Sequence, residues 1–304
     1  MSTRQLLVLL AGLASLSGLV VVGEAQCPGN VVPVRYHSLG HSYMATFVTV
    51  NHSGPYEFMV DTGSEITVIE PSLAAELKLQ PMGAAGLVTG VRQTATDVVS
   101  PEVIEFGGHA LHQPLIAVAS LAPFQDFHPR IRGILGEDFL KGFDLLIDRG
   151  KKILCLDPTT ELRGIIRGDR ISIVRQGWDD PRIAQAILVP VRLSEQKSRM
   201  MYLRLDSGAS APILYATPST WEPRVEHATP LRANVIGGST ELFKTMAPQE
   251  IRIGNHVVSD VTFAAPVASK QNVVFAGEDG LLPTSLFKRV FISYGGGFVV
   301  LEPR

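Results

Sequence analysis

Two short motifs, each built around an aspartate, stand at equivalent places in an internal repeat, and this repeat constrains the fold more than any other feature. The motifs are Asp-Thr-Gly at Asp61–Gly63 and Asp-Ser-Gly at Asp206–Gly208, separated by 145 residues (206 minus 61). In both copies apolar residues stand one and three positions before the aspartate, as a strand with alternating faces requires. Apolar residues also stand five, seven and eight positions beyond it. Such a chain is predicted to form two related halves.

The repeat continues downstream of both aspartates. Ile104–Gly107 (Ile-Glu-Phe-Gly) recurs at Ile251–Gly254 (Ile-Arg-Ile-Gly), and Gly133–Gly136 (Gly-Ile-Leu-Gly) recurs at Gly280–Pro283 (Gly-Leu-Leu-Pro). Both pairs are separated by 147 residues (251 minus 104 and 280 minus 133). The second copy has therefore gained two residues after its aspartate, and we expect them in loops, where insertions cost little.

The texture of the chain favours an all-β fold. Short runs rich in Val, Ile, Leu, Phe and Thr are broken by Gly, Pro and Asn, and few stretches have the helical period. Short helices are predicted only at residues 71–79 and 137–142. A length of 304 residues fits two domains, so we expect an N-terminal lobe at 26–158, a connection at 159–185 and a C-terminal lobe at 186–304.

The first 25 residues have the pattern of a signal peptide. Arg4 precedes an apolar run over residues 6–22, and small residues follow at 23 and 25. The chain is therefore expected to be secreted or periplasmic, with no membrane contact after cleavage. The alternative is an uncleaved membrane anchor, for which the apolar run is rather short.

Cys27 and Cys155 are the only cysteines. In an oxidising compartment they either form a disulfide or remain two buried apolar thiols, and both alternatives stay open at this point. The formal net charge of -2 offers no strong field for nucleic acid, so no nucleic-acid partner is expected.

Asp61 and Asp206 are the candidate catalytic residues. Either motif alone is also typical of a strand that ends in an Asx turn. Their equivalent places in the repeat change this, because a pseudo-twofold axis brings equivalent residues face to face. Two carboxylates held together share a proton, so that one activates water while the other donates to a substrate carbonyl. The pair indicates hydrolysis without a covalent intermediate.

These two motifs, each followed later in its copy by an apolar pair after glycine, resemble the aspartic protease superfamily. Having both aspartates on one chain is similar to pepsin, whereas the compact copies resemble two retropepsin subunits fused in tandem. The resemblance implies two β-barrel-like lobes with a cleft between them, an aspartic endopeptidase activity on a peptide or unfolded protein, no cofactor, and a monomer. It covers nearly the whole chain after the predicted signal peptide.

Glycine-rich segments in both copies resemble the tips of flaps that close over a substrate. The alternative is a pair of ordinary hairpin turns. The candidate flap and substrate-binding residues are Gly86, Thr89, Gly90, Ile236, Gly237 and Gly238.

The resemblance also assigns roles around the aspartates. The hydroxyls of Thr62 and Ser207 would cross-brace the two aspartate loops, and Ser64 would bond a catalytic carboxylate. The second copy departs from the pattern at two places. Ala209 lacks the hydroxyl of Ser64, and Pro283 stands where the first copy has a glycine, so the backbone behind the second aspartate is expected to differ.

Two other hypotheses follow from these departures. One is a peptide-binding or inhibitory module that keeps the fold with weak or no catalysis. The other is a single active lobe that dimerises. The histidines are scattered over strand-rich sequence, and we predict no metal site among them. They include His37, His41, His109, His112 and His128.

Overall fold

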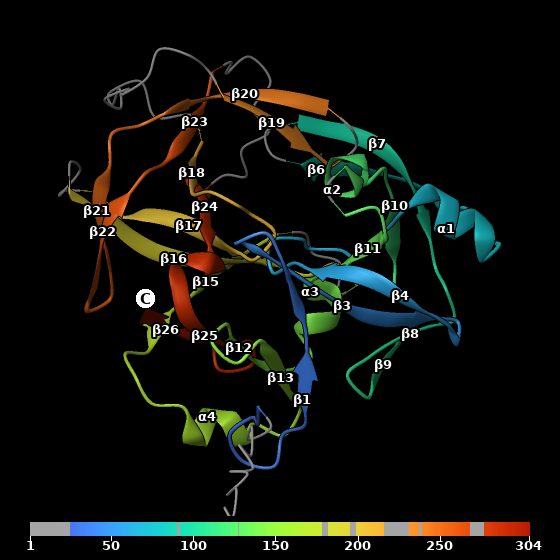
Figure 1. The fold of residues 1–304 in the computed structure, drawn as a ribbon, viewed down its shortest axis with the longest axis horizontal. Helices are drawn as coiled ribbons and strands as arrows, with labels where there is room; N and C mark the ends of the chain where they lie inside the picture. The colour runs from blue at the N-terminus through green and yellow to red at the C-terminus, as the bar shows by residue number, and fades with distance from the viewer. Residues whose placement is uncertain are drawn as a thin grey trace, which may run out of the picture.

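The structure is a computed structural model, and it describes residues 25–89, 92–126, 128–177, 182–194, 199–215, 231–236, 239–267 and 277–304. Within these ranges no helix is both long and apolar enough to cross a membrane. The predicted signal peptide lies outside the described residues except for its last residue. The described chain is mostly β, with three sheets (Figure 1).

The first sheet has ten strands, all from the first copy of the repeat. Its order is β6-β7-β10-β5-β11-β4-β3-β8-β9, and β2 pairs with β3. The bounds are β2 (His37–Leu39), β3 (Tyr43–Val50), β4 (Ser53–Val60), β5 (Val68–Ile69), β6 (Gly83–Thr89), β7 (Arg92–Val99), β8 (Val103–Phe106), β9 (His109–His112), β10 (Ile116–Val118) and β11 (Ile131–Leu135).

The second sheet also has ten strands, in the order β19-β20-β23-β18-β24-β17-β16-β21-β22, with β15 paired to β16. Every strand has its counterpart at the same place in the first sheet, which confirms the repeat. The bounds are β15 (Val174–Gln176), β16 (Ala186–Leu193), β17 (Met201–Asp206), β18 (Ile213–Leu214), β19 (Leu231–Val235), β20 (Ser239–Thr245), β21 (Gln249–Ile253), β22 (His256–Val261), β23 (Ala264–Pro266) and β24 (Gly280–Pro283).

The third sheet has six strands and joins the two halves, in the order β1-β13-β12-β25-β26-β14. At its centre β12 from the first copy runs antiparallel to β25 from the second. In Figure 1 it lies below and between the two larger sheets. The bounds are β1 (Pro33–Arg35), β12 (Asp144–Asp148), β13 (Ile153–Asp157), β14 (Ile171–Ser172), β25 (Phe287–Ser293) and β26 (Phe298–Pro303).

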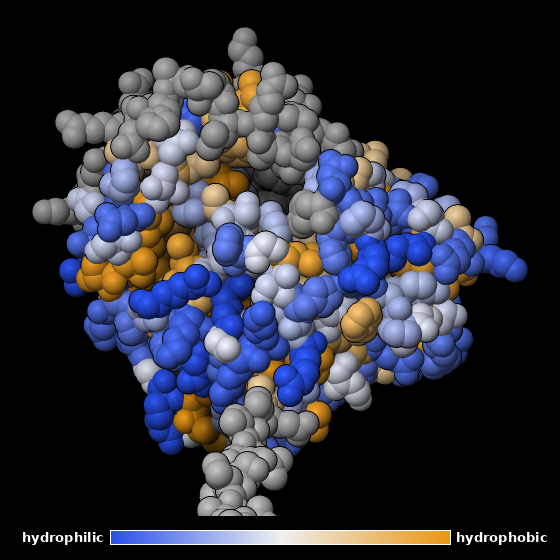
Figure 2. All heavy atoms as spheres, in the orientation of Figure 1, coloured by the Kyte–Doolittle hydropathy of each residue, from blue (hydrophilic) through white to orange (hydrophobic). Residues whose placement is uncertain are grey.

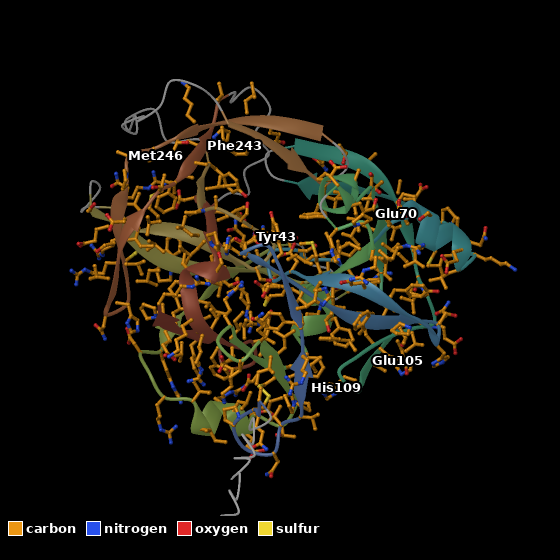
Figure 3. The ribbon with its side chains drawn as sticks, in the orientation of Figure 1. Tyr43, Glu70, Glu105, His109, Phe243 and Met246 are labelled. Atoms are coloured by element: carbon orange, nitrogen blue, oxygen red, sulfur yellow. A yellow bond between two sulfur atoms is a disulfide. The ribbon has the colours of Figure 1, made fainter. Side chains whose placement is uncertain are left out.

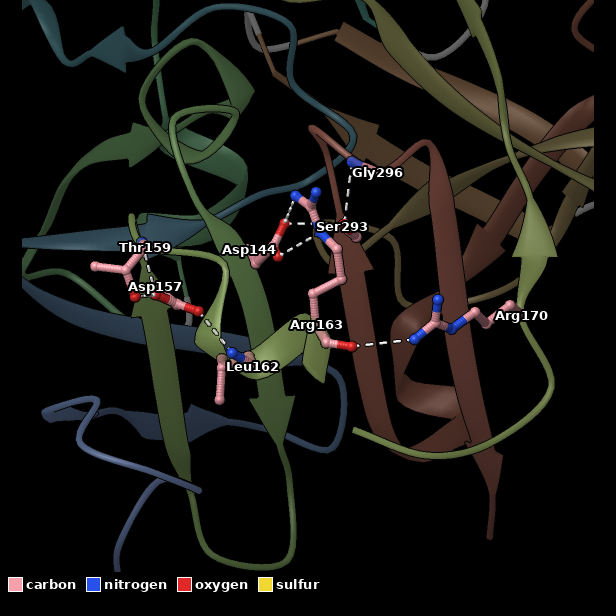
Figure 4. A network of polar contacts seen from close by, with 8 residues as sticks. All are labelled: Asp144, Asp157, Thr159, Leu162, Arg163, Arg170, Ser293 and Gly296. Atoms are coloured by element: carbon pink, nitrogen blue, oxygen red, sulfur yellow. Dashed lines mark hydrogen bonds and ion pairs between the residues drawn. The ribbon is translucent and has the colours of Figure 1, made fainter. Parts of the chain in front are cut away.

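The segment 159–185, predicted as a connection, contributes ordered elements. It contains the helix α4 (Glu161–Ile165), β14 and β15, and β15 belongs to the second ten-stranded sheet. Arg163 in α4 makes two hydrogen bonds to the buried Asp144 of β12, at 3.1 and 3.0 Å, and Ser293 of β25 donates to the same carboxylate (Figure 4). One buried carboxylate therefore holds the connection and both copies together.

A disulfide joins Cys27 to Cys155 of β13, with the two Cα atoms 5.9 Å apart. Of the two alternatives left open by the sequence, the structure has the bridge. It attaches the chain before β1 to the six-stranded sheet, next to a small apolar cluster that includes Leu146 and Phe291.

The predicted helices are present but shorter. Pro71–Glu76 forms α1, with proline at the first turn, and the left-handed backbone at Lys78 (φ 55°) prevents its continuation to residue 79. Glu137–Leu140 forms α3. The remaining short helices are α2 (Ala122–Gln125) and the 3-10 turn η2 (Thr284–Leu286).

A hydrophobic core runs through all three sheets, and its members come from both copies. A second cluster, here called the upper cluster, lies within the first half and includes Ala45, Met59, Val68 and Ile131. On the face shown in Figure 2, hydrophobic side chains show only in separated groups between hydrophilic ones. The sheets therefore cover most of the core on that face. The ends of β4 and β17 lie in the interior of the molecule, since Asp61 and Asp206 are both buried.

Candidate active site

Equivalent strands position the two aspartates. Asp61 directly follows β4, and Asp206 is the last residue of β17. Each strand has a parallel neighbour from its own half, with Leu135 opposite Val60 in the first and Leu282 opposite Leu205 in the second. The same register in both halves places the two carboxylates at equivalent points, as the repeat predicted.

The loops that follow the strands brace each other through four buried hydrogen bonds. The Thr62 N–H donates to Ser207 Oγ at 3.0 Å, and the Ser207 N–H donates to Thr62 Oγ1 at 3.1 Å. Each hydroxyl then donates to a carbonyl of the opposite strand, Thr62 to Leu205 at 2.9 Å and Ser207 to Val60 at 2.8 Å. The structure therefore places both hydroxyls as the cross-brace that the resemblance implied.

The two carboxylates face each other across the glycines. The Gly63 N–H donates to Asp61 Oδ1 at 2.8 Å, and the Gly208 N–H donates to Asp206 Oδ1 at 2.6 Å. A Cβ added at Gly63 would lie 2.4 Å from the carboxyl carbon of Asp206, and one at Gly208 would lie 2.4 Å from that of Asp61. Only glycine permits this close approach, so the residues Asp61 and Asp206 form one paired site.

The surroundings make the two carboxyl groups unequal. Burial raises the pKa of Asp206 well above its usual range, and the negative charge of Asp61 raises it further. Burial also raises the pKa of Asp61, but the Gly63 N–H and a hydrogen bond from Asp206 act against this rise. The pKa values of both carboxyl groups are therefore raised, as expected for a buried pair that shares one proton.

A buried arginine beside the pair was missed by the sequence reasoning. The Arg204 guanidinium contacts both oxygens of Glu278, the closest at 2.6 Å, and Glu65 Oε1 at 3.0 Å. It also donates to the carbonyl of Gly63 at 2.9 Å. Its charge lowers the pKa of Asp61, although less than burial raises it. The repeat could have revealed it, because the second copy has a charged residue where the first copy has the apolar Met59.

The strand register is the same in both halves, since β24 pairs with β17 as β11 pairs with β4. The backbone differs beyond it, as expected, because Gly136 directly precedes the α-helix α3 whereas Pro283 precedes the 3-10 turn η2. The difference is local. In the first half Thr67 Oγ1 accepts from the Gly136 N–H at 3.1 Å. In the second half the positions equivalent to Thr67 and Gly136 are Pro212 and Pro283, so the donor and the hydroxyl acceptor are lost together.

Ser64 does not have the partner that the resemblance implied. Its hydroxyl donates to the carbonyl of Ile66 at 2.7 Å, and its own carbonyl accepts from the N–H of Glu137 at 2.8 Å. The hydroxyl thus stabilises the turn after the first aspartate. Ala209, its equivalent, is buried.

The candidate flaps lie in two hairpins, β6–β7 and β19–β20. Gly86 pairs with Ala95 within the strands, so it lies before the tip, while Thr89 ends β6. Ile236 follows β19 and packs on the upper cluster of the first half, as Leu87 of β6 does. Gly90, Gly237 and Gly238 lie outside the described residues. The two hairpins therefore approach the same cluster.

Tyr43, at the start of β3, lies near the centre of the molecule in Figure 3. Burial raises the pKa of its hydroxyl, which is hydrogen-bonded to Ser210 of the second half and lies near the charges of both aspartates. Its ring packs on the upper cluster, edge to face with Phe124. No sequence pattern points to this residue, which lies near both aspartates and packs on the cluster that Leu87 and Ile236 also contact.

Among the described residues, one group could hold a metal ion. His37, Glu57 and His128 bring ligand atoms within 4.8 Å of one another. The other histidines named from the sequence do not belong to this group. No sequence pattern joins the three residues, because they are far apart in the chain and come together only through the sheet.

The family model described as aspartyl protease matches residues 47–139, which contain the Asp61 loop, the first hairpin and α3 up to Phe139. Among solved structures, the chain is similar to a retropepsin-like aspartic protease from Rickettsia conorii, with 21% identity and a TM-score of 0.30. That similarity covers 41% of this chain and 88% of the other. The comparison with curated proteins gave no match.

Proposed function

We propose that this chain, which carries an aspartyl protease domain at residues 47–139, is an aspartic endopeptidase with Asp61 and Asp206 as its catalytic dyad. The observation that carries the proposal is the reciprocal geometry of the two loops. Each glycine admits the carboxylate of the opposite half, and each hydroxyl braces the opposite strand. Such an arrangement holds two carboxyl groups together with one proton between them, as water-activating dyads require.

The reaction assigns different roles to the two residues. Asp61 takes a proton from a water molecule, whose oxygen adds to the carbonyl carbon of the peptide bond. Asp206 gives its proton to the carbonyl oxygen, so that a neutral tetrahedral intermediate forms. The C–N bond then breaks as the amide nitrogen receives the proton held by Asp61, and Asp206 recovers its proton from a hydroxyl of the intermediate. The dyad thus returns to its starting state.

The substrate class is a peptide or unfolded protein bound in extended form in a cleft between two lobes. The two hairpins support this, because Leu87 and Ile236 come from different halves and pack on the same cluster. Closing hairpins exclude water from the reacting bond. Tyr43, which is partly buried and lies near the charges of both aspartates, would contact the substrate.

We further propose that the chain is exported, to the periplasm or outside the cell, and acts as a monomer. The apolar run at residues 6–22 and the disulfide between Cys27 and Cys155 support export, since disulfides persist in oxidising compartments. Both aspartates on one chain support a monomer. Cell fractionation with N-terminal sequencing tests export, and light scattering of the active protein tests the monomer.

The decisive test compares Asp61→Asn and Asp206→Asn with Asp260→Asn. Asp260 is exposed and has a left-handed backbone (φ 58°), which asparagine also adopts, so this control keeps the fold. Digestion of a peptide library between about pH 3 and 8 should be abolished in the two dyad variants and kept in the control. Cleavage that survives in either dyad variant would refute the proposal.

A wild-type protein that binds peptides but cuts none over that pH range would instead identify the peptide-binding or inhibitory module. A statine-type mimic of the tetrahedral intermediate separates the cases further. It should inhibit cleavage and raise the unfolding temperature of the wild type, because it binds only the folded chain.

A further inference from the structure

Three side chains with metal-binding atoms converge on one face of the first sheet. His37 lies in β2, Glu57 lies in β4, and His128 lies in the segment between α2 and β11. His128 Nε2 is 2.8 Å from Glu57 Oε1, and His37 Nε2 contacts the same oxygen. Two ring nitrogens and one carboxylate oxygen thus meet at one point.

The sheet register explains how the three meet. Ala45 of β3 stands between His37 on one side and Met59 on the other, and Phe47 stands opposite Glu57. Because side chains alternate along a strand, all of these residues project from the same face. The small side chain of Ala45 leaves room for the His37 ring to reach across β3. On the far side of β4, His128 precedes Ile131, the partner of Glu57 in β11.

The second oxygen of Glu57 has a different neighbour. Arg130 Nε lies 3.3 Å from Oε2, so the arginine and the histidines divide the carboxylate between them. A contact of this kind orients a metal-binding carboxylate and is typical of the groups behind metal ligands. The oxygen that faces both imidazoles remains available as a ligand.

The burial of Glu57 is compensated only in part by its contacts, which include a hydrogen bond between His128 Nε2 and Oε1 at 2.8 Å. The residue is only 4% exposed, and a buried carboxylate is costly unless it is paired. Arg130 is 76% exposed, and such an ion pair contributes little. His37 Nε2 is buried and has no hydrogen-bond partner of correct geometry. A cation between the three groups would satisfy the carboxylate and this nitrogen together.

We propose that His37, Glu57 and His128 bind a divalent transition-metal ion, with Zn²⁺ as the best fit. Two imidazole nitrogens and one carboxylate oxygen are a common ligand set for this ion. Tetrahedral ligands about 2.1 Å from one ion lie about 3.4 Å from each other. The three ligand atoms already lie within 4.8 Å of one another, and both nitrogens would move away from Glu57 Oε1 by about 1 Å or less to admit the ion. The 40% exposure of the His37 side chain leaves a fourth position for water.

The bound ion would fasten three parts of the first half to one another. It links β2 and the segment after α2 to β4, and β4 is the strand that ends next to Asp61. The proposed metal site and the dyad have no residue in common. Metal binding therefore stabilises the half that carries Asp61, and the dyad itself takes no part in holding the metal.

The test uses the full chain, purified without a histidine tag, with its disulfide intact and treated to remove metal. Calorimetry with Zn²⁺ should give one site per chain, and Co²⁺ should develop the absorption bands of a four- or five-coordinate site. His37→Ala and His128→Ala should each weaken binding roughly 100-fold or more. His112→Ala is the matched control, because His112 is exposed in β9 and lies outside the group.

Two further measurements keep the result decisive. Asp61→Asn should bind Zn²⁺ as the wild type does, which excludes the dyad as the metal site. Zn²⁺ should also raise the unfolding temperature of the wild type and of His112→Ala, but not that of His37→Ala. Failure of the wild type to bind one Zn²⁺ or Co²⁺ overturns the proposal, and so does an equal loss of affinity in His112→Ala.

Discussion

Replacement of Arg204 by methionine tests how the buried charge network supports the dyad. The first copy already has Met59 at the equivalent position, so methionine is the natural exchange. In the wild type the guanidinium is bonded to Glu278, Glu65 and the Gly63 carbonyl. Arg204→Met removes all of these bonds and leaves the Glu278 carboxylate, whose side chain is 2% exposed, without its cation.

The expected loss of stability is large. Removing one partner of a buried ion pair costs about 3 to 5 kcal/mol, because the remaining charge is buried and uncompensated. Arg199→Met is the control, since Arg199 pairs with Asp279 but its side chain is 40% exposed. Loss of such a surface pair should cost about 0 to 1 kcal/mol. The free energies of unfolding are measured by urea titration followed by circular dichroism.

The double variant Arg204→Met/Glu278→Ile separates the charge from the packing. In the first copy the equivalents of Arg204 and Glu278 are Met59 and Ile131, which both belong to the upper cluster. Apolar replacement of a buried pair is often neutral, but Glu65 also loses its cation, so part of the lost stability should return. A single variant as stable as the wild type, or a double variant no more stable than the single one, would refute this account of the network.

Activity provides an independent readout of Arg204. Its positive charge lowers the pKa of both Asp61 and Asp206. Without it the pKa of Asp61 rises, so Asp61 becomes ionised only at higher pH. The acidic limb of the pH–rate profile should therefore shift to higher pH. The double variant should show a smaller shift, because the negative charge of Glu278 is lost together with the positive charge of Arg204. An unchanged profile would show that the arginine acts only on the fold.

Three further predictions concern single groups. Burial raises the pKa of Asp138 from an ordinary 3.8 to about 6, so the wild type should gain stability as the pH falls from about 6 to 4. In urea titrations the free energy of unfolding of Asp138→Asn should therefore exceed that of the wild type by up to about 3 kcal/mol at pH 7. Below about pH 4 the two proteins should be equally stable. Gly208→Ala should abolish cleavage because its Cβ would lie 2.3 Å from Asp61 Oδ2, whereas Gly142→Ala, with its nearest contact at 3.6 Å, should remain active. Replacing Cys27 and its partner by serine should cost about 2 to 4 kcal/mol in thermal unfolding, because the bridge closes a long loop in the unfolded chain, and it should leave cleavage at low temperature unchanged.

Much of the fold could be predicted because the repeat has physical meaning at each position. Period-two apolar residues before Asp61 and Asp206 identified β4 and β17. The constant separation identified Gly133–Gly136 and Gly280–Pro283 as equivalent, and the structure shows that these elements are the parallel neighbours of β4 and β17. The cross-brace of Thr62 and Ser207 followed from a resemblance carried by the same motifs. These features depend on local sequence and on its repetition, and both can be recognised in the amino-acid sequence alone.

The remaining features depend on which strands become neighbours. Arg204 finds Glu65 and Glu278, and Glu57 finds His37 and His128, across long stretches of chain that no periodicity connects. The compensation for Pro283 likewise appears only when β18 and β24 lie side by side.

The sequence alone determined that two equivalent aspartate loops exist and where each begins. The tertiary structure decided which buried charges come together between the halves, and therefore in which direction the pKa of each aspartate is shifted. The reason is that a carboxyl group's pKa depends on burial and on charges brought near by folding, which are properties of the assembled sheets.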